Sequence, residues 1–111
     1  MINWKTAATT LVVAASCIGQ TVQAVEARGM RSCGTWTKER AVQGVDHFVS
    51  EAWLLGYLSG MAFVSSKNIL KGTDNDSLYL WMDNYCKANP LKDEADGAND
   101  LYFELVRQKR M

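Results

Sequence analysis

The sequence predicts an all-α protein, a small bundle of three to four helices clasped by one disulfide. Three observations support this prediction. Beyond residue 33 the apolar residues recur at spacings of three and four, which is the period of an amphipathic helix. Alternation of apolar and polar residues, which is typical of strands, never extends beyond four residues. Two cysteines follow the N-terminal segment, and a chain of 111 residues is short enough to benefit from a covalent bond.

The N-terminus has the features of a secretory signal peptide over residues 1–24. Lys5 precedes an apolar stretch at residues 7–18, and small residues then lead to a cleavage site after Ala24, with Ala27 as the second choice. The apolar stretch is shorter than the roughly 20 residues that span a bilayer. We therefore expect this segment to be cleaved, with no stable membrane insertion afterwards.

Export predicts that the mature protein is periplasmic or secreted. A lipoprotein anchored through Cys17 is the minor alternative, because small residues precede this cysteine but the usual aliphatic residue three positions upstream is missing. In the soluble form we expect residues 25–32 to be a flexible lead-in, since they show no period. Residues 33–111 are expected to form the helical domain.

Cleavage leaves Cys33 and Cys86, and an even number of cysteines in an oxidising compartment predicts one disulfide. The chain-entropy model gives such a bond a stabilisation of about 4 kcal/mol. Metal binding and redox catalysis fit less well, because there is no C-x-x-C motif and His47 is the only histidine. We therefore expect neither a metal site nor a cofactor.

The first helix is expected within residues 35–40, with Thr35 as its cap. A long helix is expected over residues 45–67, where apolar residues cover a broad face. Its two adjoining stripes are Val45, Phe48, Ala52, Leu55, Ser59 and Ala62, and Val49, Trp53, Gly56, Gly60 and Phe63. The small residues at positions 52, 56 and 60 make a smooth strip, and we expect another helix of the core to pack closely against it. A membrane role is the alternative, because Gly-xxx-Gly is also typical of helix dimers in membranes.

The third helix is expected over residues 77–88, capped by Asn75 or Asp76. Its buried stripe would contain Leu78, Met82 and Tyr85. The last helix is expected to begin at Pro90, with Asn89 as its cap. Its buried residues, spaced by three and four, would be Leu91, Ala95, Ala98, Tyr102 and Leu105.

The charge and the motifs exclude several classes of function. The chain carries 12 Lys and Arg against 12 Asp and Glu, so it lacks the clustered basic charge that a nucleic-acid-binding protein needs. Nothing in the sequence pairs His47 with a nucleophile, and no catalytic motif is complete, so we predict that the protein is not an enzyme. The acidic run from Asp74 fails the EF-hand pattern, because Tyr79 stands at the required glycine.

Two aromatic pairs are candidate partner-binding residues. Trp53 and Tyr57 lie one helical turn apart, and so do Trp81 and Tyr85. Trp and Tyr dominate the hot spots of protein interfaces, and a core this small cannot bury all of its aromatic side chains. Ordinary core packing is the alternative for both pairs.

Three acidic residues are candidate acid sensors, namely Asp93, Asp96 and Asp100. They share one face of the expected last helix, so they would repel one another at neutral pH and be relieved by protonation. The alternative is that Asp93 and Glu94 favour a helix N-terminus and that the other acidic residues keep the surface soluble.

The segment Tyr-Cys-Lys-Ala-Asn-Pro at residues 85–90, with the two-cysteine frame, resembles the HdeA/HdeB group of small periplasmic acid-stress proteins, HdeB above all. That group combines a signal peptide, a short helical domain, one disulfide and a Tyr-Cys-Lys-x-Asn-Pro segment before the last helix. Residues 55–60, Leu-Gly-Tyr-Leu-Ser-Gly, are similar to the Gly-Tyr-Ile-x-Gly helix of Tai-type immunity proteins, which inhibit secreted amidase toxins. Those proteins typically carry further cysteines, which are absent here.

The first resemblance implies a holdase that loosens or dissociates in acid and exposes apolar surface to unfolding clients. The disulfide would then keep the loosened chain compact. The second resemblance implies an inhibitor whose long helix or neighbouring loop blocks the active site of one toxin. We therefore expect a protein that binds either many protein clients or a single protein partner, and a structural role in the envelope is a further alternative.

Overall fold

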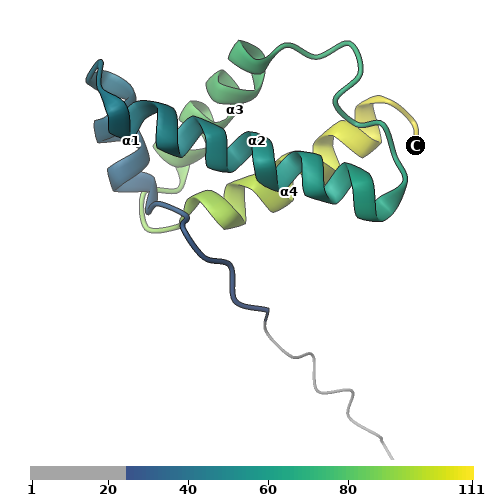
Figure 1. Cartoon of the computed structure of the whole chain (residues 1–111), viewed down its shortest axis with the longest axis horizontal. Coiled ribbons are helices and arrows are strands. Elements are labelled where there is room, and N and C mark those ends of the chain that lie inside the picture. Colours follow the sequence, from purple (N-terminus) through teal and green to yellow (C-terminus); the bar gives the residue numbers. More distant parts are fainter. Residues whose placement is uncertain (1–24) are drawn as a thin grey trace, which may run out of the picture.

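The computed structural model describes residues 25–111, so the expected signal peptide and Cys17 lie outside the described residues. Four helices make up most of this part of the chain (Figure 1). They are α1 (Cys33–Ala41), α2 (Val45–Ser65), α3 (Asn75–Ala88) and α4 (Glu94–Gln108). The prediction of a small all-α bundle is therefore confirmed.

The helices pack in a ring: α1 contacts α2 and α3, and α4 closes the ring by contacting α2 and α3 from the other side. Figure 1 shows α2 running alongside α4, with α1 at one end of the bundle. Apolar side chains from all four helices, and one from the loop between α2 and α3, fill the centre. The fully or nearly fully buried apolar residues are Cys33, Trp36, Leu54, Leu58, Ile69, Leu78, Met82, Cys86, Ala98, Leu101, Tyr102 and Leu105.

The predicted disulfide is present between Cys33 and Cys86, whose Cα atoms are 4.9 Å apart. It joins the first residue of α1 to the last turn of α3, and both sulfur-bearing residues are buried. The backbone beside it is also fixed, because the Cys33 N–H donates to the Lys92 carbonyl at 2.9 Å. Such a bond persists in oxidising compartments, so it indicates a location outside the cytoplasm.

The helices begin at capping residues that differ from the predicted ones. Ser32 caps α1, because its hydroxyl accepts from the Thr35 N–H at 3.1 Å. Asp74 caps α3, because its carboxylate accepts from the Ser77 N–H at 2.7 Å. Thr35 and the two predicted caps of the third helix, Asn75 and Asp76, therefore lie inside the first turns instead. Each predicted cap lies one to three residues C-terminal to the observed one, because several residues that can cap a helix (Ser, Thr, Asp and Asn) lie close together at these boundaries.

The predicted start of the last helix was also wrong. Asn89 ends α3, and the chain then makes a turn that leaves Leu91 99% exposed. Helix α4 begins at Glu94 and is capped by Asp93, which forms a reciprocal capping box with Asp96. Pro90 can begin a helix, but the competing capping box three residues later provides two backbone hydrogen bonds that Asn89 does not.

Helix α2 faces the core with a different side from the one predicted. Its buried residues are Ser50, Glu51, Leu54 and Leu58, whereas most of the predicted stripes point to solvent. The helix is apolar around most of its circumference, and by length and composition alone it could cross a membrane. Apolar periodicity therefore could not identify its inner side, which is chosen by the polar contacts of its first turns.

The predicted close helix approach occurs at another glycine. Side-chain carbons placed at Gly56 or Gly60 would meet no atom of the described chain within 4 Å, so no helix of residues 25–111 covers that strip. A Cβ at Gly97 of α4 would lie only 2.6 Å from Met82 Sδ and 2.8 Å from Tyr85 Cδ1 of α3. The tight crossing in this bundle is therefore that of α3 with α4.

Candidate functional site

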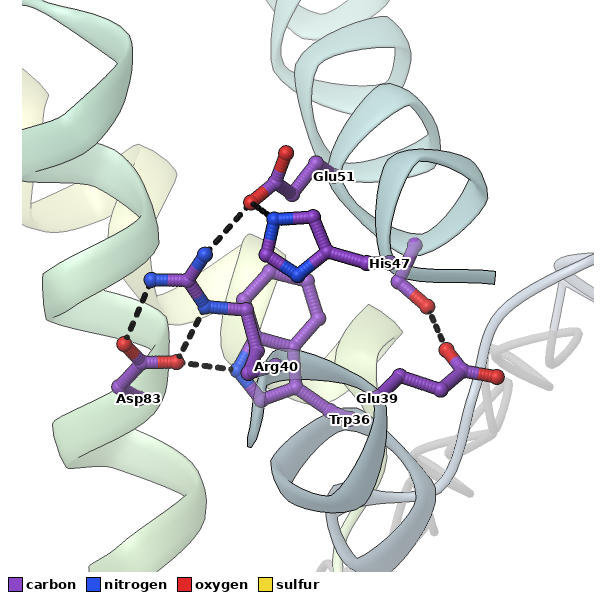
Figure 2. Close-up of polar contacts among 7 residues, drawn as sticks. Trp36, Glu39, Arg40, His47, Glu51 and Asp83 are labelled. Atoms are coloured by element: carbon purple, nitrogen blue, oxygen red, sulfur yellow. Dashed lines mark hydrogen bonds and ion pairs between the residues drawn. The ribbon is translucent and has the colours of Figure 1, made fainter. Parts of the chain in front are cut away.

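A cluster of charged and aromatic side chains lies where α1, α2 and α3 meet (Figure 2). We call it the Arg40 cluster, and its members are Trp36, Arg40, His47, Glu51 and Asp83. Trp36 and Arg40 come from α1, the first turns of α2 supply His47 and Glu51, and Asp83 comes from α3. The cluster therefore joins three helices of the ring at one point.

Arg40 is the centre of the cluster. Its Nε and Nη2 atoms donate to the two carboxylate oxygens of Asp83 at 2.9 and 3.0 Å, which is a bidentate geometry. Its Nη1 donates to Glu51 Oε1 at 2.5 Å. The hydrogen bonds to Asp83, more than any other contact, raise the pKa of Arg40. A single guanidinium thus neutralises one carboxylate from α2 and one from α3.

Aromatic groups and a histidine complete the cluster. The indole N–H of the fully buried Trp36 donates to Asp83 Oδ1 at 2.8 Å. His47 Nε2 lies 2.8 Å from Glu51 Oε1 across one turn of α2. The Arg40 guanidinium also lies 5.5 Å from the ring centre of Tyr79, within the range of a cation–π interaction. These contacts orient both carboxylates, so the cluster has one well-defined arrangement.

A second set of polar contacts extends from the cluster towards the N-terminus. The Ser50 hydroxyl of α2 donates to the Glu39 carboxylate of α1 (Figure 2). Glu39 also lies 3.3 Å from Arg31 Nε in the segment before α1. The inner side of the first turns of α2 is therefore held to α1 by charge and hydrogen bonds, in contrast to the apolar contacts at Leu54 and Leu58 further along.

Glu94 is a buried carboxyl at the start of α4, beside the segment that precedes α1. The Arg31 N–H donates to its Oε2 at 3.2 Å, and its own N–H donates to the Arg31 carbonyl at 2.8 Å. Oε1 has no hydrogen-bond partner in the described part of the chain. Burial raises the pKa of Glu94 to about 7. This carboxyl is therefore neutral in acid, where its burial carries no charge penalty.

The four predicted partner-binding residues form two stacked pairs. Trp53 and Tyr57 stack with ring centres 5.2 Å apart, and Trp81 and Tyr85 stack at 5.5 Å. All four side chains are half-buried, and the Trp53 indole N–H donates to the Arg28 carbonyl at 2.7 Å. The pairs lie on α2 and α3, which are across the ring from each other, so they do not form one patch.

The three predicted acid sensors lie at the start of α4. Asp93 and Asp96 are engaged in the capping box, where the Asp96 N–H donates to Asp93 Oδ1 at 2.9 Å. Asp100 is exposed one turn further along. Asp93 therefore takes the place at the helix start that the alternative interpretation gave it, and Asp96 completes the capping box.

The Arg40 cluster was missed by sequence reasoning, and little in the sequence could have shown it. Arg40 lies 11 residues before Glu51 and 43 residues before Asp83, so no helical spacing connects them. One signal was available: Glu51 and His47 interrupt an otherwise apolar helix at positions one turn apart, which indicates a paired polar face. In the structure, this face of α2 is the one that packs against the core.

Comparison of the chain with family models, with curated proteins and with solved structures gives no match. A function is therefore proposed below from the geometry of residues 25–111.

Proposed function

We propose that this protein is a small periplasmic protein-binding protein, a holdase of the HdeA/HdeB acid-stress type and not an enzyme. The observation that carries the proposal is the Arg40 cluster. Two helices are attached to α1 there through carboxylates, Glu51 from α2 and Asp83 from α3. A carboxylate loses its negative charge when it is protonated, whereas arginine keeps its positive charge. Acid strong enough to protonate the carboxylates would therefore leave the guanidinium without its counter-charges.

The same acid leaves two other attachments in place. The bond between Cys33 and Cys86 does not respond to protons, so α1 and α3 stay joined. Glu94 is neutral in acid and its buried position is then favoured, which keeps the start of α4 beside the segment before α1. Loosening is therefore directed at α2, which is attached to α1 by charge and not by a covalent bond.

Release of the first turns of α2 would expose apolar surface. Leu54 and Leu58 on its inner side are fully buried in the folded state, and so is Met82 of α3. The half-buried aromatic pairs of α2 and α3 each pack against this core and supply rigid contact area. Client proteins that unfold in acid expose apolar segments under the same conditions, so the protein and its clients would expose apolar surface at the same pH.

The experiment imitates protonation at neutral pH. The double variant Asp83→Asn, Glu51→Gln removes both carboxylate charges while nearly keeping side-chain shape. We expect it to remain helical, to bind the apolar dye ANS and to suppress client aggregation at neutral pH, as the unmodified protein should below about pH 4. The matched control is Glu104→Gln, which removes a carboxylate from the exposed pair with Arg107 on α4. It should behave like the unmodified protein.

The outcomes separate the proposal from its alternatives. A double variant that exposes apolar surface but protects no client contradicts the holdase. An unmodified protein that stays compact and protects nothing from neutral pH to about pH 2 contradicts it as well.

A second candidate function is inhibition of one secreted toxin. It is favoured by the Trp53–Tyr57 pair, which is already fixed in the folded state by the bond from Trp53 to the Arg28 carbonyl. Preordered aromatic side chains give high affinity for one partner, because little side-chain freedom is lost on binding. If the protein is such an inhibitor, Trp53→Ala should abolish its binding to one partner protein of the envelope. The same variant should leave the exposure of apolar surface in acid unchanged. A structural envelope protein would show neither behaviour.

A further inference from the structure

Basic residues gather at one end of the bundle, where the loop after α2 lies beside the end of α4 (Figure 1). The Lys109 ammonium donates a hydrogen bond to the Lys71 carbonyl, which joins these two parts of the chain. Residues 61–73 and 105–111 contain no acidic residue. We call the basic residues of these two segments the basic end, and they are Lys67, Lys71, Arg107, Lys109 and Arg110.

The balanced charge of the whole sequence conceals this basic end. The rest of the described chain contains twice as many acidic as basic residues, so the basic end is positive on an otherwise negative domain. Of its five members, Arg107 alone forms an ion pair within residues 25–111, with Glu104 of the same helix. The hydrogen bond of Lys109 goes to a neutral carbonyl, which leaves its charge uncompensated. Four cations at this end can therefore attract an anion.

The helix dipole explains only part of the basic end. Cations are favoured near a helix C-terminus, which accounts for Arg107 in the last turn of α4 and for Lys67 just after α2. The effect falls off within one turn, so it does not reach Lys71, six residues beyond the end of α2. It also gives no reason for apolar side chains to be exposed beside these charges.

Two such side chains are Phe63 and Val64 in the last turn of α2, which are 87% and 84% exposed. Phe63 and Lys67 line the same surface hollow, together with Leu70. A partner that fits this place combines negative charge with an apolar interior. A bilayer with anionic lipids has both, because phosphate groups lie at its surface and acyl chains lie directly beneath. A nucleic acid offers the phosphates but gains little from an exposed phenylalanine.

We propose that the basic end docks the folded protein onto the surface of a bilayer that contains anionic phospholipids. The cations contact headgroup phosphates, and Phe63 and Val64 enter the boundary between headgroups and acyl chains. The protein lies on the bilayer and does not cross it, because Leu54 and Leu58 of α2 stay in the protein core. The length of α2, about 30 Å, separates the basic end from the Arg40 cluster. Docking is therefore independent of the proposed acid response and is tested at neutral pH without clients.

Cosedimentation of the oxidised, exported protein with lipid vesicles measures docking. We expect weak binding to vesicles of phosphatidylcholine and strong binding when phosphatidylglycerol is added. Binding should weaken as salt rises from about 0.01 M to about 0.15 M, because the Debye length falls from about 30 Å to about 8 Å. A protein that does not bind the phosphatidylglycerol vesicles even at the lower salt concentration overturns the proposal.

A pair of lysine substitutions tests the charge. Lys67→Gln with Lys71→Gln should lower the affinity for these vesicles by about tenfold or more, because each cation near an anionic surface contributes to binding. The matched control is Lys87→Gln with Lys92→Gln, which removes the same charge at the other end of the bundle, near the start of α4. The control should bind like the unmodified protein. Equal loss in both variants would mean that only the net charge matters and would overturn the proposal.

A single substitution tests the apolar contact. Phe63→Ala changes an exposed side chain to a good helix former, so the fold should be retained, as circular dichroism can check. Its affinity for the vesicles should fall severalfold with an unchanged salt dependence, whereas Leu91→Ala, at an equally exposed position near the start of α4, should have no effect. Binding to duplex DNA as tight as to the vesicles, with Phe63→Ala unchanged on both, would assign the basic end to a soluble polyanion and overturn the proposal.

Discussion

The crossing of α3 with α4 and the small-residue strip of α2 at positions 52, 56 and 60 both place glycine within a helix, yet their surroundings are opposite. At Gly97 a single added carbon would collide with Met82 and Tyr85 of the facing helix. At Gly56 and Gly60 the same carbon would meet no atom of residues 25–111 within 4 Å. Gly97 is required by the close contact with α3. Gly56 and Gly60 also lack a side chain, but no helix of residues 25–111 packs against them.

This difference teaches that a small-residue strip indicates a close approach without identifying the partner. The strip at positions 52, 56 and 60 is the stronger pattern in the sequence, because its residues are four apart along one helix. Gly97 stands alone in an acidic segment and attracts no attention. The tight intramolecular packing nevertheless occurs at Gly97. Four experiments test how sharply the closed α3–α4 side and the open α2 side differ.

The largest effect is expected from loss of the disulfide, which joins α1 to the α3 helix of the closed side. The bond encloses a separation of 53 residues, so replacing Cys33 and Cys86 by alanine should lower the free energy of unfolding by about 4 kcal/mol. Urea unfolding of the oxidised protein, the reduced protein and the double variant measures this. A loss below about 1 kcal/mol would show that the helix contacts alone hold the closed side together.

The next effect is a pH dependence at the start of α4. Folding raises the pKa of Glu94 from 4.5 to about 7. The protonated carboxyl therefore contributes to the free energy of unfolding in full below pH 4.5, and this contribution is lost as the pH rises through 7. Between these limits the loss should reach about 3 kcal/mol. Glu94→Gln should remove this dependence. Urea unfolding of both proteins across the range would contradict the assignment if their stabilities fell in parallel.

A smaller effect is expected at Gly97. Alanine there gains helix propensity but forces its Cβ against the buried Met82 and the ring of Tyr85, so Gly97→Ala should lower the free energy of unfolding by about 1 to 2 kcal/mol. Thermal unfolding followed by circular dichroism measures the change. Unchanged stability would mean that Met82 can repack, and that the crossing is less tight than its distances indicate.

The smallest effect has the opposite sign. Gly56→Ala adds a carbon in open space and improves helix propensity, so in dilute solution it should raise the free energy of unfolding by up to about 1 kcal/mol. The same unfolding measurement, made beside that of Gly97→Ala, gives the comparison directly. Destabilisation by Gly56→Ala would indicate that the space beside Gly56 is filled in solution.

Much of the architecture could be predicted, because it depends on local patterns. The four helices and the pairing of Cys33 with Cys86 follow from apolar spacing and from the cysteine count after cleavage. Helix starts were displaced where several capping residues compete, as at Asp74, Asn75 and Asp76. Local patterns cannot rank such neighbours, because the tertiary fold selects the first turn.

The inner side of α2 and the Arg40 cluster could not be predicted, for a related reason. Helix α2 has apolar residues on most of its circumference, so the side that faces the core depends on the ion pair of Glu51. The cation of that pair is Arg40, which belongs to another helix. The sequence alone likewise indicates that Asp83 is a surface residue of α3. Only the tertiary structure shows that Arg40 and the Trp36 indole donate hydrogen bonds to it. These contacts join distant parts of the sequence, and apolar periodicity carries no information about them.

The open space above Gly56 and Gly60 also has an evolutionary consequence. A glycine whose added side chain would meet no atom of residues 25–111 can be replaced without a steric cost to folding, and replacement by alanine would even stabilise the helix. Glycine that persists at these two positions across descendants of this chain would therefore record selection by something outside the fold. Gly97 could never serve as such a record, because Met82 and Tyr85 would preserve it in any case.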